Sequence, residues 1–233
     1  MIIALNNKSN LDKEEFEKYN NELEKINTKH TIILCPSEIN IPMATHRNYF
    51  LGSQNISMSK EGAHTGETNA SQLYSYDVKY TIIGHSERRQ EEYETDEDTN
   101  KKIKRAIDCN LTPILCIGES QEERNNNNYK EVLAREITIA TRDLTETDKS
   151  KIIIAYEPIW SIGTGVIPTI EQIDEVFEYI KEFLPYNKIL YGGSANEDNI
   201  EELNNCKYID GFLLGGLSLK LENLQEFISK IKD

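Results

Sequence analysis

Two ionisable side chains follow apolar runs closely enough to lie at strand ends. Glu157 comes directly after residues 152–156, and His85 comes two residues after the run 80–83. A positioned carboxylate can remove a proton from carbon, and a neutral imidazole can donate a hydrogen bond to a substrate oxygen. His85 also precedes an expected helix start, whose positive end disfavours the charged imidazolium. The alternative roles are a solvated glutamate and a structural histidine.

Glycine-rich segments follow two later apolar runs. Gly192, Gly193 and Ser194 come after one run, and Gly215 and Gly216 come after the next. Free backbone N–H groups at strand ends can bind a phosphate group. The alternative is that these glycines only form tight turns, since neither segment has the spacing of a Walker loop or of a dinucleotide-binding motif.

The segment after Glu157 has the composition of a moving lid. Gly163 and Gly165 permit backbone conformations that a moving, anion-contacting loop needs. Trp160 and Ile162 would give such a lid an apolar underside. The alternative is an ordinary loop between a strand and a helix.

Two polar residues, Asn6 and Lys8, follow the first apolar run of the chain. Lys8 is a candidate local positive charge, and its alternative role is that of a surface amine with a buried stem. The pair His85-x-Glu87 is also found in zinc deaminases, but their second motif, P-C-x-x-C, is absent from the sequence. We therefore expect no metal site.

Eight short apolar runs alternate with segments of helical periodicity. The runs suit parallel strands that are buried on both faces. They cover residues 2–5, 31–35, 49–52, 80–83, 112–117, 152–156, 189–191 and 211–214. Eight such units favour an α/β fold, a closed (β/α)8 barrel forming a single domain over residues 1–233, although an open doubly wound sheet gives a similar pattern. The acidic run 91–98 is interpreted as a solvated helix start.

The overall composition excludes several classes of partner. The chain has 26 basic and 40 acidic residues, a net charge of −14, which repels nucleic acids and anionic membranes. No apolar run is long enough to span a bilayer, and the N-terminal run is too short for a secretory leader, so we expect a cytoplasmic protein. The four cysteines form no C-x-x-C pair and are expected to be reduced, structural thiols.

Several motifs occur in the order found in one enzyme family and extend over essentially the whole chain. They are Asn6-x-Lys8, Gln54-Asn55, Gly62-Ala63-His64-Thr65-Gly66-Glu67, the His85 segment, Cys116-Ile117-Gly118-Glu119, the Glu157 loop, Tyr191-Gly192-Gly193-Ser194 and residues 211–216. Taken together they resemble the triosephosphate isomerase family, whose fold is the TIM barrel. A match to one motif would be weak, whereas this many in register are very specific.

The resemblance implies a role for each candidate residue. Glu157 would be the base that moves the carbon-bound proton, and His85 the neutral electrophile that also shuttles protons between the oxygens. Lys8 and Asn6 would stabilise and orient the developing enediolate, and Glu87 would support the same segment. The backbone N–H groups of Gly163, Ser194, Gly215 and Gly216 would hold the phosphate of a small phosphorylated triose. No cofactor is implied.

The resemblance also implies a homodimer. In the family, the loop that matches residues 61–67 enters the partner subunit, so Thr65, Glu67 and Arg88 are expected at the interface. The alternative is a surface loop with one exposed histidine.

The sequence departs from the family pattern at several positions. Asn7 stands where a bulky aromatic is usual, Leu217 replaces a commonly small residue, and Val166 replaces a frequent lysine. None of these removes a chemical group from the implied mechanism. A barrel retained only for binding, or another phosphosugar enzyme, remains as an alternative, but Glu157 and His85 together favour the isomerase.

Overall fold

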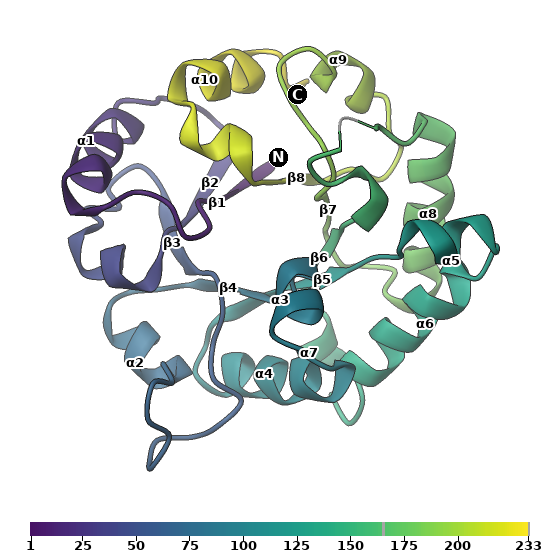
Figure 1. Cartoon of the computed structure of the whole chain (residues 1–233), viewed down its shortest axis with the longest axis horizontal. Coiled ribbons are helices and arrows are strands. Elements are labelled where there is room, and N and C mark those ends of the chain that lie inside the picture. The colour runs from purple at the N-terminus through teal and green to yellow at the C-terminus, as the bar shows by residue number, and fades with distance from the viewer. Residues whose placement is uncertain (165, 233) are drawn as a thin grey trace.

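Eight parallel strands close into a barrel in the computed structural model, and the helices form a ring around it (Figure 1). The structure describes residues 1–164 and 166–232, so Gly165 of the expected lid lies outside the described residues. The strands are β1 (Ile2–Asn6), β2 (Thr31–Cys35), β3 (Phe50–Ser53), β4 (Tyr80–Ile83), β5 (Thr112–Ile117), β6 (Ile153–Tyr156), β7 (Ile189–Tyr191) and β8 (Gly211–Leu214). Each predicted strand is present, with its ends shifted by one residue at most.

The barrel closes because the first strand pairs with the last. Ile2 of β1 is in register with Thr31 of β2 on one side and with Gly211 of β8 on the other. A side chain at Gly211 would collide with the backbone of Ile2, so glycine is required where these two strands meet. The closed (β/α)8 barrel is thereby confirmed, and the open sheet is excluded.

The helices follow the strands as expected for a parallel sheet. They are α1 (Lys13–Leu23), α2 (Ala70–Ser75), α3 (Ser86–Glu91), α4 (Asp96–Asp108), α5 (Gln121–Asn125), α6 (Tyr129–Ala140), α7 (Glu146–Lys149), α8 (Ile170–Phe183), α9 (Ile200–Leu203) and α10 (Leu221–Ser229). Three short segments are 3-10 helices, namely η1 (Glu38–Met43), η2 (Ile159–Ser161) and η3 (Gly216–Leu219). Thr95 caps α4 by accepting a bond from the N–H of Asp98, whose carboxylate bonds back to the N–H of Thr95.

Alternating strand residues fill two layers of core. Ile3 and Leu5 of β1 pack in the large cluster shared with the helices, whereas Ile2 and Ala4 belong to a second cluster built from strand residues. A strand buried on both faces has to be apolar throughout, which is why the runs could be recognised in the sequence.

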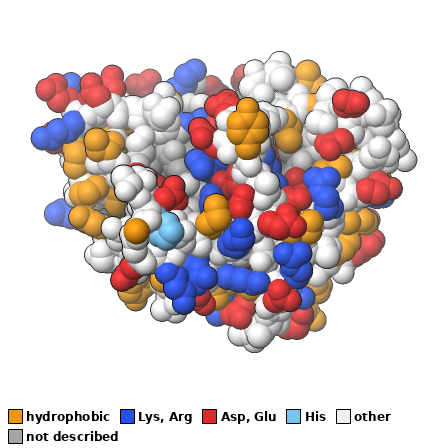
Figure 2. All heavy atoms as spheres, turned by 60° about the horizontal axis from the view of Figure 1, so that its bottom comes forward, with side chains coloured by type: hydrophobic (Ala, Val, Ile, Leu, Met, Phe, Trp, Pro, Cys, Tyr) orange, Lys and Arg blue, Asp and Glu red, His pale blue; other side chains and the backbone are white. Residues whose placement is uncertain are grey.

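The outer surface carries most of the charged side chains. Acidic and basic side chains lie interspersed over the face shown in Figure 2, which brings the lower part of Figure 1 forward. The four cysteines are free thiols, and Cys35 and Cys116 are buried in β2 and β5. In the described part of the chain, no helix combines the length and the apolar character needed to cross a membrane.

Candidate active site

The carboxyl ends of the strands surround a polar cavity of about 450 Å³. Strand ends are where barrels of this type place their functional residues, and the volume suits a small ligand. The cavity is lined by eight of the candidate residues, which are Asn6, Lys8, His85, Glu157, Gly163, Ser194, Gly215 and Gly216. Glu87 does not line it and lies in an adjoining groove.

His85 and Glu157 form a buried pair. The imidazole Nε2 lies 3.0 Å from Glu157 Oε1, and the other carboxylate oxygen accepts the backbone N–H of Ser86 at 3.0 Å. The imidazole Nδ1 accepts the N–H of Glu87 at 3.2 Å, so His85 caps the start of α3. Because Nδ1 accepts and Nε2 donates, this arrangement corresponds to a neutral imidazole.

The two members of this pair shift each other's pKa. Burial acts to raise the pKa of Glu157, but His85 and the Ser86 N–H outweigh it, so the pKa lies below the ordinary glutamate value. Burial acts to lower the pKa of His85, but the charge and hydrogen bond of Glu157, together with the charge of Glu87, outweigh it, so the pKa is raised. The helix start was expected to disfavour imidazolium, whereas the neighbouring carboxylates favour it and the pKa lies above the ordinary histidine value.

Lys8 lies across the cavity mouth in a restrained conformation. Its φ angle is 53°, in the left-handed region, and its amide donates to Asn6 Oδ1 at 3.1 Å. The ammonium group forms an ion pair with Glu87. Lys8 therefore has a partner that fixes its position, and it is not a loosely placed surface amine.

The segment that follows Glu157 is tied to both sides of the cavity. Glu119 is fully buried and accepts hydrogen bonds from Tyr156 Oη at 3.0 Å and from Trp160 Nε1 at 2.9 Å. At the other side Ser194 Oγ donates to the carbonyl of Ser161 at 2.5 Å. These contacts hold η2 between the end of β5 and the loop after β7.

The glycine-lined side of the cavity is more open. Gly163 has φ 67° and is exposed, Gly216 is exposed, and Ser194 is half-buried. Leu217, one of the departures from the family pattern, also lines this side. The exposed backbone here is suited to accept an anionic group from solvent.

The departure at Asn7 has a structural explanation. Asn7 is buried, and its side-chain amide donates to Ser218 Oγ at 3.1 Å and to Tyr19 Oη at 3.4 Å. Tyr19 in turn donates to the carbonyl of Ser218 at 2.8 Å. A hydrogen-bonded link between β1 and η3 thus stands where an aromatic side chain is usual. The other departure, Val166, is exposed.

The expected interface residues are only partly brought together. Glu67 and Arg88 line the groove that adjoins the cavity, which also contains Glu87. Thr65 is exposed in the loop between β3 and α2 and does not line this groove. The loop projects beyond the ring of helices near α2 (Figure 1).

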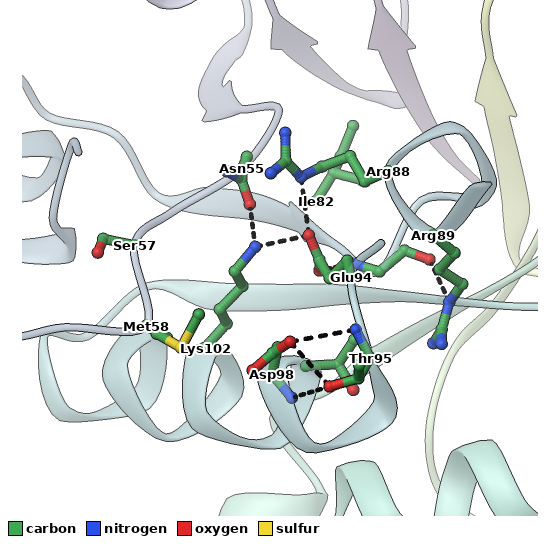
Figure 3. A network of polar contacts seen from close by, with 12 residues as sticks. Asn55, Ser57, Met58, Ile82, Arg88, Arg89, Glu94, Thr95, Asp98 and Lys102 are labelled. Atoms are coloured by element: carbon green, nitrogen blue, oxygen red, sulfur yellow. Dashed lines mark hydrogen bonds and ion pairs between the residues drawn. The ribbon is translucent and has the colours of Figure 1, made fainter. Parts of the chain in front are cut away.

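Sequence reasoning missed two buried glutamates next to the site. Glu94, in the acidic run interpreted as a solvated helix start, is only 7% exposed, so that interpretation was wrong at this position. It accepts bonds from Arg88 Nε at 2.7 Å and from Lys102 Nζ at 2.6 Å, as Figure 3 shows. The second is Glu136 of α6, which is 3% exposed. Its signal was a glutamate on the apolar face of an amphipathic helix.

The chain also matches known proteins over its full length. Residues 1–231 match the family model described as triosephosphate isomerase. Relatives with that name from Clostridium botulinum (strain Langeland) and Mycoplasma mobile are both 40% identical, covering 98% and 99% of this chain and 98% of each relative. One from Francisella tularensis is 41% identical over 77% of this chain and 74% of its own length. The chain therefore belongs to the triosephosphate isomerase family.

Proposed function

We propose that this protein interconverts dihydroxyacetone phosphate and D-glyceraldehyde 3-phosphate by proton transfer through an enediolate. The observation that carries the proposal is the buried Glu157 and His85 pair, 3.0 Å apart, in a cavity whose other wall is made of exposed glycine backbone. The family match over residues 1–231 supports the same activity. Triosephosphate isomerase is itself the standard example of a carboxylate base with a neutral imidazole and a closing loop.

In the proposed reaction Glu157 removes a proton from the carbon next to the substrate carbonyl. The C–H electron pair forms the carbon–carbon double bond, and the carbonyl oxygen becomes the enediolate oxygen. The Nε2–H of His85 and the ammonium of Lys8 stabilise this charge, and Asn6 orients it. His85 then moves a proton between the two oxygens, and Glu157 returns its proton to the neighbouring carbon. This sequence requires no cofactor.

Substrate binding would also strengthen the base. In the free enzyme, the contact with His85 lowers the pKa of Glu157 against the effect of burial. When a substrate oxygen takes the Nε2–H, that contact is lost, and burial is then opposed mainly by the Ser86 N–H. The basicity of Glu157 then rises when the carbon-bound proton is within reach.

The phosphate would bind at the glycine-lined side of the cavity. The N–H groups of Gly163, Ser194, Gly215 and Gly216 line it and can donate to a dianion. A phosphorylated enediolate can lose phosphate to water, so a lid that excludes water protects the product. The existing contact between Ser194 and Ser161 would help to hold that lid over the ligand.

We propose that two copies of the chain form a homodimer in which Thr65 enters the partner's groove. Glu67 and Arg88 of that groove would then lie at the interface, next to Glu87 and its ion pair with Lys8. All chemical groups stay within one chain, while the partner supports the position of Lys8. A cytoplasmic location is proposed because the substrates belong to glycolysis and gluconeogenesis.

A coupled assay tests the activity. The purified full-length protein receives D-glyceraldehyde 3-phosphate, and an NADH-dependent dehydrogenase reports the dihydroxyacetone phosphate formed. The expected result is turnover without added metal or cofactor, accompanied by incorporation of solvent deuterium at the carbon that Glu157 would serve. Absence of turnover in a folded protein would refute the isomerase assignment and favour a binding barrel.

A further inference from the structure

Two buried glutamates hold the glycines that follow β4 and β5. The N–H of Gly84 donates to Glu94 Oε1 at 3.0 Å, and the N–H of Gly118 donates to Glu136 Oε2 at 2.9 Å. Glu94 lies just before α4, whereas Glu136 is on α6. The same interaction is therefore made twice, at neighbouring strand ends, by carboxylates from outside the barrel.

Each glycine determines the place of one member of the reactive pair. Gly84 directly precedes His85. Gly118 lies against the backbone of Glu157, where an added Cβ atom would collide with the Glu157 carbonyl oxygen. The N–H of Glu157 also donates to the carbonyl of Ile117 at 2.8 Å. A shift of the Gly118 amide therefore moves the backbone that carries Glu157.

The two glutamates differ in their charged neighbours. Burial acts to raise the pKa of Glu94, but Lys102 and Arg88, both within hydrogen-bond distance, outweigh it and the pKa is lowered. Glu94 therefore remains a carboxylate at neutral pH.

Glu136 lacks so close a cation. Burial raises its pKa to about 7. Arg89 Nη1 of α3 lies 3.7 Å from Glu136 Oε1, and the same nitrogen lies 2.6 Å from an Asp96 carboxylate oxygen of α4. Arg135, on the same helix as Glu136, lies 4.0 Å from Glu136 Oε1. Asp96 adds a negative charge that raises the pKa further, and the Gly118 N–H lowers it. Glu136 thus titrates in the neutral range, unlike its counterpart.

We propose that Glu136 is a positioning residue whose protonation state controls how firmly Gly118 holds the backbone of Glu157. The proposal rests on the isomerase function given above. As a carboxylate, Glu136 accepts a charge-assisted hydrogen bond from the Gly118 N–H and attracts Arg89. Arg89 in turn donates to the carbonyls of Gly84 at 2.8 Å and Cys116 at 3.3 Å. As a neutral acid, Glu136 loses the charge-assisted character of its bond with Gly118 and its attraction to Arg89. Acidification through neutral pH therefore loosens the end of β5.

The first test compares the pH dependence of kcat in three proteins. Glu136→Gln keeps an acceptor for Gly118 but cannot titrate, and Glu131→Gln makes the same change at an exposed position of the same helix. Between about pH 8 and about pH 6 we expect the wild-type kcat to fall about fivefold more than that of Glu136→Gln, with KM changing equally in both. Glu131→Gln should follow the wild type. Equal pH profiles of kcat in all three proteins would overturn the proposal.

Thermal unfolding tests independently of activity how the protonation of Glu136 changes the stability of the protein. A carboxyl whose folded pKa is raised contributes its stability below the unfolded pKa, and that stability is lost as the pH rises through the folded value of about 7. Glu136→Gln should therefore raise the melting temperature more at about pH 8 than at about pH 5. A pH-independent difference would show that Glu136 does not titrate in this range, against the proposal.

The wild-type protein supplies a measurement that needs no variant. The amide resonance of Gly118, followed by NMR, should shift with a midpoint near neutral pH, whereas that of Gly84 should not. This titration is readable even if the coupled assay detects no turnover, so a failure of the isomerase function is distinguishable from a failure of the coupling. A Gly118 amide that does not respond to pH would refute the coupling.

Discussion

The two sides of the barrel mouth are built by different means. On the side of β4 and β6, His85 and Glu157 are 6% and 2% exposed and already contact each other. On the side of β7 and β8, exposed glycine backbone and the half-buried Ser194 line the same cavity. In the proposed mechanism the first side transfers the proton and the second binds the phosphate. We therefore expect changes on the first side to lower kcat and changes on the second to raise KM.

Glu157→Gln should give the largest effect. The amide keeps the shape of the side chain but cannot accept a carbon-bound proton, so kcat should fall by ~10²–10⁴-fold, the range of general base catalysis. Binding of a phosphate-bearing substrate analogue, measured by calorimetry, should be retained because the glycine-lined side is untouched. Near-normal turnover would show that another group is the base.

Lys8→Met should rank next, with a loss of ~10²–10³-fold in kcat, typical of removing one electrostatic contact to a developing negative charge. Lys8→Arg need not restore activity, because the planar guanidinium does not reproduce the ammonium geometry. Circular dichroism should show an unchanged fold. A Lys8→Met protein that is unfolded, or fully active, would return Lys8 to a structural or surface role.

Thr65→Arg tests whether the proton-transfer side depends on a second subunit. A long side chain in place of Thr65 disfavours association by its size, so specific activity should fall roughly tenfold as the dimer dissociates. Light scattering and activity are measured together over a dilution series. A wild-type protein that is monomeric and fully active at high dilution would separate assembly from catalysis, and an active Thr65→Arg dimer would place the interface elsewhere.

Ser194→Ala should produce the smallest change, on the phosphate side. It removes the hydrogen bond to the Ser161 carbonyl, 2.5 Å long, and a bond of this kind contributes roughly 1 kcal/mol, or about fivefold in KM. The matched control is Ser229→Ala, whose hydroxyl bonds a carbonyl at the exposed end of α10. A fall in kcat without a change in KM would mean that the two sides are not separable in this way.

Much of this fold could be predicted because parallel barrel strands are apolar on both faces. The run that ends at Tyr156 is uninterrupted, and the run that ends at Ile83 contains one polar residue, Thr81. The reactive residues were found for the same reason, since His85 and Glu157 follow those runs. The sequence could show that they lie at strand ends, but not that they touch, because that contact depends on barrel curvature.

The supporting residues were harder to find. Glu94 lies among other acidic residues, and nothing local distinguishes the one that accepts a bond from Lys102. Glu136 falls between Leu133 and Ile137 on the buried face of α6, which is a detectable signal, but its partner Gly118 comes from another element. A long-range hydrogen bond has no periodicity, so patterns along the chain do not reveal it.

The pairing of β1 with β8 also sets when the protein becomes active. Asn6 is the last residue of the first barrel strand and Lys8 follows that strand, whereas Gly215 and Gly216 follow the last barrel strand. Closing the barrel needs contacts between opposite ends of the chain, which form slowly compared with local helices. During refolding, helical signal should therefore return before enzymatic activity, and the recovery of activity reports the moment at which the last strand joins the first.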